Sequence, residues 1–267
     1  MGNHKVLPTT PKKEPDDHEA SVAFGYRAVA AADKQGLVNE VFSQVAERYD
    51  QMNDLLSGGL HRLWKDDLVA LLDPPRTTRR FRVLDVAGGT GDVAFRILRA
   101  GGAGTSVVIA DISPAMMAEG RVRAQHEGLS ARCRFAGANA EALPFGDRSF
   151  EGYTIAFGIR NVTHVEAALT EAFRVLKPGG RFVCLEFSDV DVPGLDALYD
   201  AYSFTVMPAV GHVVTGEGAA YRYLAESIRI FPCAAEFAGM IAAAGFSRVT
   251  TRKLAGGIVA IHSAWRL

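Results

Sequence analysis

Hydrophobic and polar positions follow two different periods along the middle of the chain. Short runs of apolar and β-branched residues, typical of buried strands, alternate with stretches whose apolar residues recur every three or four positions, typical of amphipathic helices. The predicted strands cover residues 81–86, 106–110, 133–136, 152–156 and 181–187, and the predicted helices cover residues 92–99, residues 165–176 and a segment that starts at Ser113 and Pro114. Strands that alternate with helices pair in parallel through right-handed crossovers. The pattern therefore predicts an α/β fold with a doubly wound, Rossmann-like, mainly parallel sheet.

The segments on either side of this core have different patterns. Amphipathic spacing predicts helices at residues 37–50 and 61–72 before the core, and at residues 195–207 and 233–244 after it. A strand pair at residues 246–254 and 257–266 is expected to end the sheet with an antiparallel strand. Residues 208–232 are polar, aromatic and glycine-bearing, which in a compact domain favours a cover over a substrate.

One domain accounts for this organisation. Residues 1–33 are assigned to a flexible leader, because the residues up to about Glu19 are rich in Lys, Pro, Asp and Thr and lack the pattern of a transit or signal peptide. Residues 34–267 are assigned to a single domain. Its parts are the N-terminal helices (34–75), the core (80–190), the substrate cover (195–232) and the terminal helix with its strand pair (233–267).

Composition and charge narrow the range of partners. The 29 Lys and Arg residues nearly balance the 30 Asp and Glu residues, so no global charge would attract nucleic acid or an anionic membrane. Cys133, Cys184 and Cys233 are far apart in the sequence, which is typical of reduced thiols rather than of disulfides or a metal site. No apolar stretch reaches the roughly 18 to 20 residues that a membrane-spanning helix needs. These features favour a small-molecule partner in a reducing compartment.

A glycine-rich turn after the first predicted strand gives the strongest local signal. Asp85 precedes the segment Gly88-Gly89-Thr90-Gly91, and Asp92 opens the next helix. Glycines let a ligand approach the backbone, and a helix N-terminus offers free N–H groups. Asp111 ends the second strand, where a carboxylate can accept both hydroxyls of an adenosine ribose. This combination indicates a nucleoside cofactor.

The residues around the turn separate two cofactor classes. A dinucleotide dehydrogenase would be expected to show G-x-G-x-x-G and room for a pyrophosphate. Carboxylates at Asp85 and Asp92 would repel a pyrophosphate, whereas Asp85 would attract the amino group or sulfonium of S-adenosylmethionine. Asn139 follows the third strand, where its amide can read an adenine edge; a simple turn residue is the alternative there. The pattern favours a methyl donor over a nicotinamide cofactor.

Motifs spread over the chain resemble those of one family. They are FSQVAERYDQMND at residues 42–54, HRLWK at 61–65, the turn at 87–92, FGIRNV at 157–162, LEFS at 185–188, YDAYS at 199–203 and YRYLAESI at 221–228. Together they resemble the ubiquinone/menaquinone C-methyltransferases of the UbiE type, from about Phe24 to the C-terminus. The resemblance implies a class I S-adenosylmethionine-dependent methyltransferase fold.

That resemblance also implies an activity and a setting. The implied reaction is methylation of a ring carbon of a 2-methoxy-6-polyprenyl-1,4-benzoquinol to the 5-methyl product of ubiquinone synthesis. Methylation of demethylmenaquinol or of another small hydroxylated ring is the enzymatic alternative, and a structural subunit of a quinone-synthesis complex is the non-enzymatic one. The form AFGIRN at residues 156–161 resembles mitochondrial and α-proteobacterial members. We therefore expect peripheral placement on the matrix face of the mitochondrial inner membrane or, alternatively, in a bacterial cytoplasm, in a multi-subunit complex and as a homodimer.

Binding residues follow from the same resemblance. Thr90, Asp111, Asn139 and Ala140 are implied as contacts of S-adenosylmethionine, beside Asp85 and Gly88 of the turn. One position departs from many bacterial members, since Ala156 stands where they have Ser.

Methyl transfer to carbon requires a ring made nucleophilic by loss of a hydroxyl proton, so the enzyme must position the ring and stabilise a phenolate. Arg160 is the predicted catalytic residue, because it follows the fourth strand at the edge where ligands bind; a structural ion pair is its alternative role. His212 is a weaker prediction for a general base. The residues predicted to line the ring pocket are Tyr49, Asn161, Tyr202, His212, Tyr221 and Arg222.

Overall fold

A seven-stranded sheet forms the centre of the molecule. The computed structural model describes residues 21–45, 53–54, 57–190 and 218–267. The strand order is β5-β4-β3-β6-β7-β9-β8. The strands are β3 (Phe81–Val86), β4 (Thr105–Asp111), β5 (Cys133–Gly137), β6 (Phe150–Ala156), β7 (Leu176–Phe187), β8 (Ser247–Leu254) and β9 (Val259–Arg266). Strands β3 to β7 pair in parallel, whereas β9 lies antiparallel between β7 and β8. The predicted mainly parallel sheet with a C-terminal antiparallel strand is confirmed.

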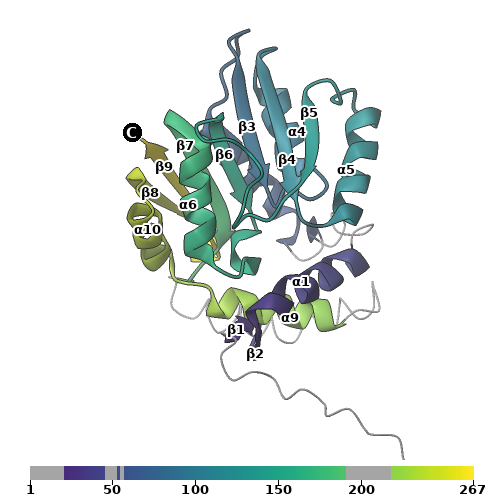
Figure 1. The fold of residues 1–267 in the computed structure, drawn as a ribbon, viewed down its shortest axis with the longest axis vertical. Helices are drawn as coiled ribbons and strands as arrows, with labels where there is room; N and C mark the ends of the chain where they lie inside the picture. The colour runs from purple at the N-terminus through teal and green to yellow at the C-terminus, as the bar shows by residue number, and fades with distance from the viewer. Residues whose placement is uncertain (1–20, 46–52, 55–56, 191–217) are drawn as a thin grey trace, which may run out of the picture.

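Helices cover both faces of this sheet. They are α3 (Leu60–Leu72), α4 (Asp92–Ala100), α5 (Pro114–His126), α6 (Val165–Val175) and α10 (Ala234–Ala243). Figure 1 shows α6 and α10 on one side of the sheet and α4 and α5 toward the other. The neighbours Val83 and Leu84 are both fully buried but belong to separate apolar clusters, one against α3 and α4 and the other against α6 and α10. Such strands are buried on both faces, which explains their continuous apolar runs.

The N-terminal segment differs from the sequence prediction. Residues 21–30 form a hairpin of β1 (Ser21–Phe24) and β2 (Arg27–Ala30), and α1 (Ala31–Val45) follows directly. The flexible leader expected over residues 1–33 therefore does not hold for residues 21–33. The Phe24 ring stacks on that of Tyr223 with centroids 4.3 Å apart, so a distant part of the chain anchors the hairpin.

The segment expected to cover a substrate is described in part. Residues Gly218–Ile230 form helix α9, which packs against α1. Figure 1 shows α1, α9 and the hairpin together below the sheet, at the end where the parallel strands terminate. The helix expected at residues 195–207 and most of the predicted cover lie outside the described residues. Segments that are far apart in the sequence, the hairpin with α1 and the helix α9, thus lie together at one end of the sheet.

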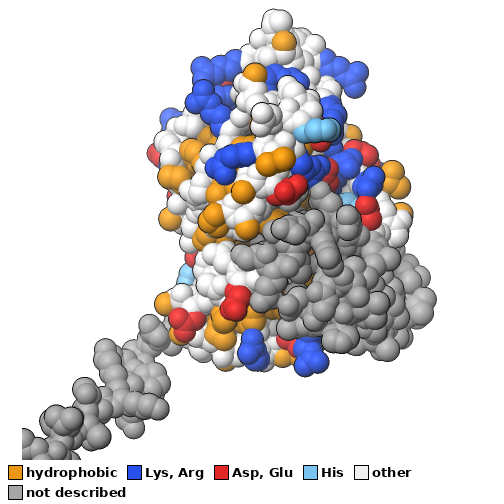
Figure 2. Space-filling view, turned by 90° about the vertical axis from the view of Figure 1, so that its right-hand side faces the viewer, with side chains coloured by type: hydrophobic (Ala, Val, Ile, Leu, Met, Phe, Trp, Pro, Cys, Tyr) orange, Lys and Arg blue, Asp and Glu red, His pale blue; other side chains and the backbone are white. Residues whose placement is uncertain are grey.

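Surface charge, the cysteines and the length of the apolar helices can each be compared with what the sequence indicated. Figure 2 shows basic, acidic and apolar side chains interspersed on one face of the molecule. Cys133, Cys184 and Cys233 are free thiols, and the first two are buried. Within the described ranges no helix combines the length and apolarity needed to cross a bilayer.

Candidate functional site

A pocket opens where the parallel strands end. The turns that follow β3, β4, β5 and β6 form its floor, and side chains of α1 and α3 close over it. Its lining includes all six residues that the sequence assigned to a cofactor: Asp85, Gly88, Thr90, Asp111, Asn139 and Ala140. The topology explains this convergence, because the carboxyl ends of parallel strands share one edge of the sheet. Cofactor contacts at these six positions remain a prediction.

Gly88 shows why the turn after β3 needs glycine. A Cβ at this position would lie 2.8 Å from Ile109 Cγ2 and 2.9 Å from Asp85 Oδ2, too close for any side chain. Gly88 and Gly89 line the pocket with main chain alone, directly before the first turn of α4. Because glycine has no side chain, a ligand can approach the main chain of the turn closely.

Asp85 is the most unusual polar residue in the pocket. Its side chain is buried, and Oδ1 accepts a hydrogen bond from the Thr154 hydroxyl at 2.7 Å. Oδ2 has no hydrogen-bond partner among the described residues. Burial raises the pKa of Asp85 to about 7, although the Thr154 hydrogen bond and the Lys65 charge oppose the shift. A buried carboxylate oxygen without a partner at a pocket wall is suited to a cationic ligand group.

Asp111 is held in place by the backbone. Oδ2 accepts from the Gly89 N–H at 2.8 Å and Oδ1 from the Ser113 N–H at 2.8 Å. Burial raises the pKa of Asp111 above its ordinary value, while these N–H groups lower it. Each carboxylate oxygen keeps further acceptor capacity, so both can receive vicinal hydroxyls. The geometry fits the ribose role that was predicted for this side chain.

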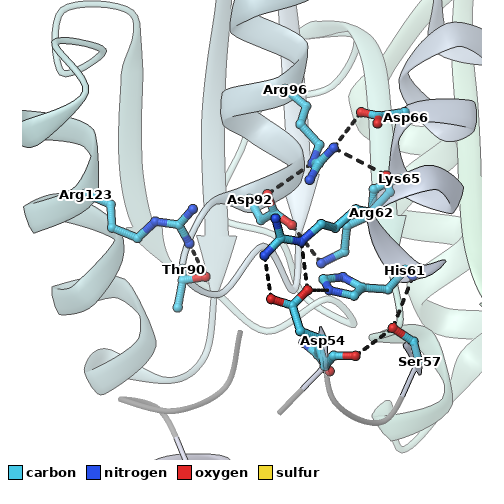
Figure 3. A network of polar contacts seen from close by, with 11 residues as sticks. Asp54, Ser57, His61, Arg62, Lys65, Asp66, Thr90, Asp92, Arg96 and Arg123 are labelled. Carbon is cyan, nitrogen blue, oxygen red and sulfur yellow. Dashed lines mark hydrogen bonds and ion pairs between the residues drawn. The ribbon is translucent and has the colours of Figure 1, made fainter. Parts of the chain in front are cut away.

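Hydrogen bonds within the protein hold Asn139 and Thr90, two of the predicted cofactor contacts. Asn139 Oδ1 accepts from the Glu141 N–H at 2.9 Å, which is the turn role left open as its alternative. Ala140 is buried beside it. The Thr90 hydroxyl accepts from Arg123 of α5 at 3.1 Å, as Figure 3 shows. Asn139 and Thr90 therefore line the pocket with part of their hydrogen-bonding capacity already used within the protein.

Lys65 is a pocket residue that the sequence analysis missed. Its ammonium lies 2.9 Å from Asp92 Oδ2, and Arg96 contacts Asp92 Oδ1 at 3.1 Å from the other side (Figure 3). Burial alone would raise the pKa of Asp92, but the Lys65 and Arg96 charges outweigh it and hold this pKa well below its ordinary range. The HRLWK motif contained this lysine, and only the packing of α3 against α4 shows where it points.

Arg160 does not line the pocket directly. It lies in the short 3-10 helix η2 (Ile159–Asn161), is buried, and contacts Glu186 Oε1 at 2.8 Å. It also donates to the Phe157 carbonyl at 2.5 Å, while Nε has no partner among the described residues. The ion pair that was its alternative role is thus present. A catalytic role for Arg160 stays a prediction.

The predicted ring pocket is only partly described. Asn161 lines the pocket and accepts from the Tyr223 hydroxyl at 3.0 Å, and burial raises the pKa of Tyr223 to about 12. Arg222 is exposed on α9. Tyr221 belongs to the same helix, but its side chain lies outside the described residues, as do the whole residues Tyr49, Tyr202 and His212. Tyr223 is a contact of the site that the sequence analysis passed over, although it stands in the YRYLAESI motif.

Comparisons with known proteins agree with this geometry. A family model described as the ubiE/COQ5 methyltransferase family matches residues 28–266. A protein of Methylobacterium nodulans named ubiquinone/menaquinone biosynthesis C-methyltransferase UbiE is 61% identical over 249 residues, which is 93% of this chain and 98% of that protein. A relative of the same name from Nitrobacter hamburgensis is 59% identical over 244 residues, covering 91% of this chain and 96% of its own length.

Solved structures support the fold independently. A methyltransferase of Thermotoga maritima that depends on S-adenosylmethionine superposes with a TM-score of 0.59 at 19% identity, over 85% of this chain and 99% of that one. At this level of identity the likeness shows the fold alone.

Proposed function

Since the chain belongs to the ubiE/COQ5 methyltransferase family, we propose that it transfers a methyl group from S-adenosylmethionine to a ring carbon of a 2-methoxy-6-polyprenyl-1,4-benzoquinol. The enzyme class, the cofactor and the quinone pathway rest on relatives that cover nearly the whole chain. The observation that carries the proposal is the pocket itself. Its free Asp85 oxygen, the Gly88 backbone and the Asp111 carboxylate lie along adjoining strand ends.

These residues fit the methyl donor better than a dinucleotide. Gly88 lines the pocket with main chain alone, and three carboxylates, those of Asp85, Asp92 and Asp111, line it as well. Carboxylates at this density disfavour a pyrophosphate and favour a ligand with positive charge. When bound, S-adenosylmethionine supplies an electrophilic methyl group. Asp111 would bind the ribose hydroxyls, and Asp85 would bind the positively charged amino group or sulfonium of the methionine part.

We propose that Arg160, which follows β6, supplies the positive charge that acts on the acceptor ring. Its guanidinium lies beside the Phe157 carbonyl, one residue before Asn161 of the pocket wall. Glu186 balances the charge in the protein without ligand, and Nε is a buried donor that has no partner among the described residues. A guanidinium in this position would stabilise the phenolate form of the ring, which is the nucleophilic form.

The quinone branch is the finer part of the proposal. The printed names of the relatives include both ubiquinone and menaquinone, so a demethylmenaquinol acceptor is the alternative. These relatives are bacterial, which favours the bacterial cytoplasm and lends no support to the mitochondrial inner membrane that the motifs also suggested. Peripheral contact with a membrane, a homodimer and a multi-subunit complex remain proposals.

An acceptor comparison tests the proposal. The purified full chain is incubated with S-adenosylmethionine and either reduced 2-methoxy-6-prenyl-benzoquinol or reduced demethylmenaquinol of equal tail length, and products are measured by mass spectrometry. We expect a gain of one methyl with the benzoquinol at the higher rate. Asp111→Ala, which removes the ribose acceptor, is the control and should yield no product. If quinone synthesis in cells continued with Asp111→Ala in place of the wild type, the chain would instead serve as a structural subunit.

A further inference from the structure

The charge of the pocket is unevenly distributed. Among the described lining residues, three carry carboxylates, whereas Lys65 carries the single ammonium or guanidinium. S-adenosylmethionine has a carboxylate of its own at the amino-acid end. A carboxylate placed among Asp85, Asp92 and Asp111 would be repelled unless a cation meets it. The question is therefore which end of the ligand Lys65 faces.

The spatial order of the strands places Lys65 away from the predicted nucleoside contacts. Asn139 follows β5, Asp111 ends β4 and Asp85 belongs to β3, in the spatial order β5-β4-β3-β6. A nucleoside placed on Asn139 and Asp111 directs the rest of the ligand toward β3 and β6. Lys65 enters the pocket at that end, because α3 packs against β6, β7 and α4.

The side chain of Lys65 is held in place rather than free in solvent. Only 6% of the residue is exposed, and its ammonium is fixed by Asp92 at 2.9 Å. Arg96 also pairs with Asp92, so the negative charge of Asp92 is balanced by a second cation besides Lys65. An ammonium has three donors, and the contact with Asp92 uses one of them. Two donors remain for a ligand at the pocket wall.

On this basis, and resting on the proposed use of S-adenosylmethionine, we propose that Lys65 binds the carboxylate of the cofactor's amino-acid end while Asp85 binds its ammonium. The two residues lie on different elements, α3 and β3, and both line the pocket, near enough for the Lys65 charge to lower the pKa of Asp85. Together they would recognise a zwitterion. The pocket would then distinguish ligands that carry the carboxylate from ligands that lack only this group.

Calorimetric titration with two stable ligands tests this assignment. The ligands are S-adenosylhomocysteine and S-adenosyl-3-thiopropylamine, which differs from the former by loss of the carboxylate. The wild type should prefer S-adenosylhomocysteine by roughly ten- to a hundredfold, the usual range for a charged hydrogen bond. Lys65→Met should lose this preference through weaker binding of S-adenosylhomocysteine, with the affinity for the amine unchanged or higher.

Two further variants separate ligand binding from the structural ion pair. Arg96→Met removes the other partner of Asp92 and lies outside the pocket lining, so it should keep the preference. Lys65→Gln keeps a hydrogen-bond donor for Asp92 but removes the charge, and it should lose the preference as Lys65→Met does. This second variant keeps the test valid if Lys65→Met folds poorly. Equal weakening of both ligands by the Lys65 variants, or a wild type without preference, would overturn the proposal. A wild type that bound neither ligand would instead refute the proposed cofactor.

Discussion

The Thr154 hydroxyl donates to Asp85 Oδ1 at 2.7 Å, while the second oxygen of the same carboxylate has no hydrogen-bond partner among the described residues. Thr154 lies on β6 and Asp85 on β3, and these residues stand opposite each other in the parallel ladder. The contact fixes the carboxylate so that one oxygen is used within the core and the other stays available. We therefore expect ligand binding at Asp85 to depend on pH, because burial raises the pKa of this carboxyl to about 7.

Cofactor affinity should therefore rise as the pH increases through 7. Burial raises the pKa of Asp85 to about 7, so the carboxyl is largely protonated at pH 6 and largely ionised at pH 8. A cationic ammonium needs the ionised form, and S-adenosylhomocysteine should bind about tenfold more tightly at pH 8 than at pH 6. Asp85→Asn should bind it weakly at both pH values. Calorimetry that showed the same pH slope in the variant would contradict the assignment to Asp85.

The stability of the ligand-free protein should depend on Asp85 in the opposite direction. The folded protein retains a proton that the unfolded chain releases above the ordinary value of 3.8. The contribution of Asp85 to the free energy of unfolding therefore falls as the pH rises from about 4 to 7 and is constant above that. Urea titrations of Asp85→Asn and the wild type should diverge over this window in favour of the variant. A constant difference between them would show that the pKa is not raised.

Gly158 should tolerate no side chain. A Cβ at this position would meet the Cβ of Ala87 at 2.4 Å, where the strand ends of β3 and β6 approach each other. Gly158→Ala should lower the free energy of unfolding by about 1 to 3 kcal/mol through overpacking. Gly239→Ala is the matched control, because it lies in α10 with open space around its Cβ and should be neutral or stabilise by up to about 1 kcal/mol. Equal effects of the two changes in thermal unfolding would refute the close approach.

The Arg160–Glu186 pair permits a test that separates stability from catalysis. Arg160→Met leaves the Glu186 carboxylate buried without its cation and should cost about 3 to 5 kcal/mol of the free energy of unfolding. Adding Glu186→Gln removes the unpaired charge and should restore most of that stability, because the amide can still accept from the Phe187 N–H. Methyl transfer should remain low in the stable double variant. Recovery of the wild-type turnover would show that Arg160 has only a structural role.

Much of the central sheet could be predicted because its signals are local. The strands around Asp85 and Asp111 are short apolar runs with a carboxylate at the last or second-last position, and glycines mark the turn that follows β3. The convergence of these groups at one pocket follows from parallel pairing alone. Asn161, in the short helix η2 after β6, lines the same pocket, and its contact with an acceptor ring stays a prediction.

The remaining features depend on contacts between distant segments. The hairpin at residues 21–30 has strands of four residues and depends on the stacking of Phe24 on Tyr223. The insertion of β9 between β7 and β8 changes no local pattern, so only the pairing registers reveal it. Lys65 looked like an ordinary polar position of an amphipathic helix. Its burial at the pocket wall results from how α3 packs against α4.

The most direct test of the account follows the methyl carbon itself. The full chain is supplied with S-adenosylmethionine labelled with carbon-13 in the methyl group and with reduced 2-methoxy-6-prenyl-benzoquinol, and the product is examined by carbon NMR. The account predicts a labelled methyl signal with one-bond coupling to a ring carbon at position 5. A labelled methyl on a ring oxygen, or no transfer by protein that binds S-adenosylhomocysteine, would contradict it.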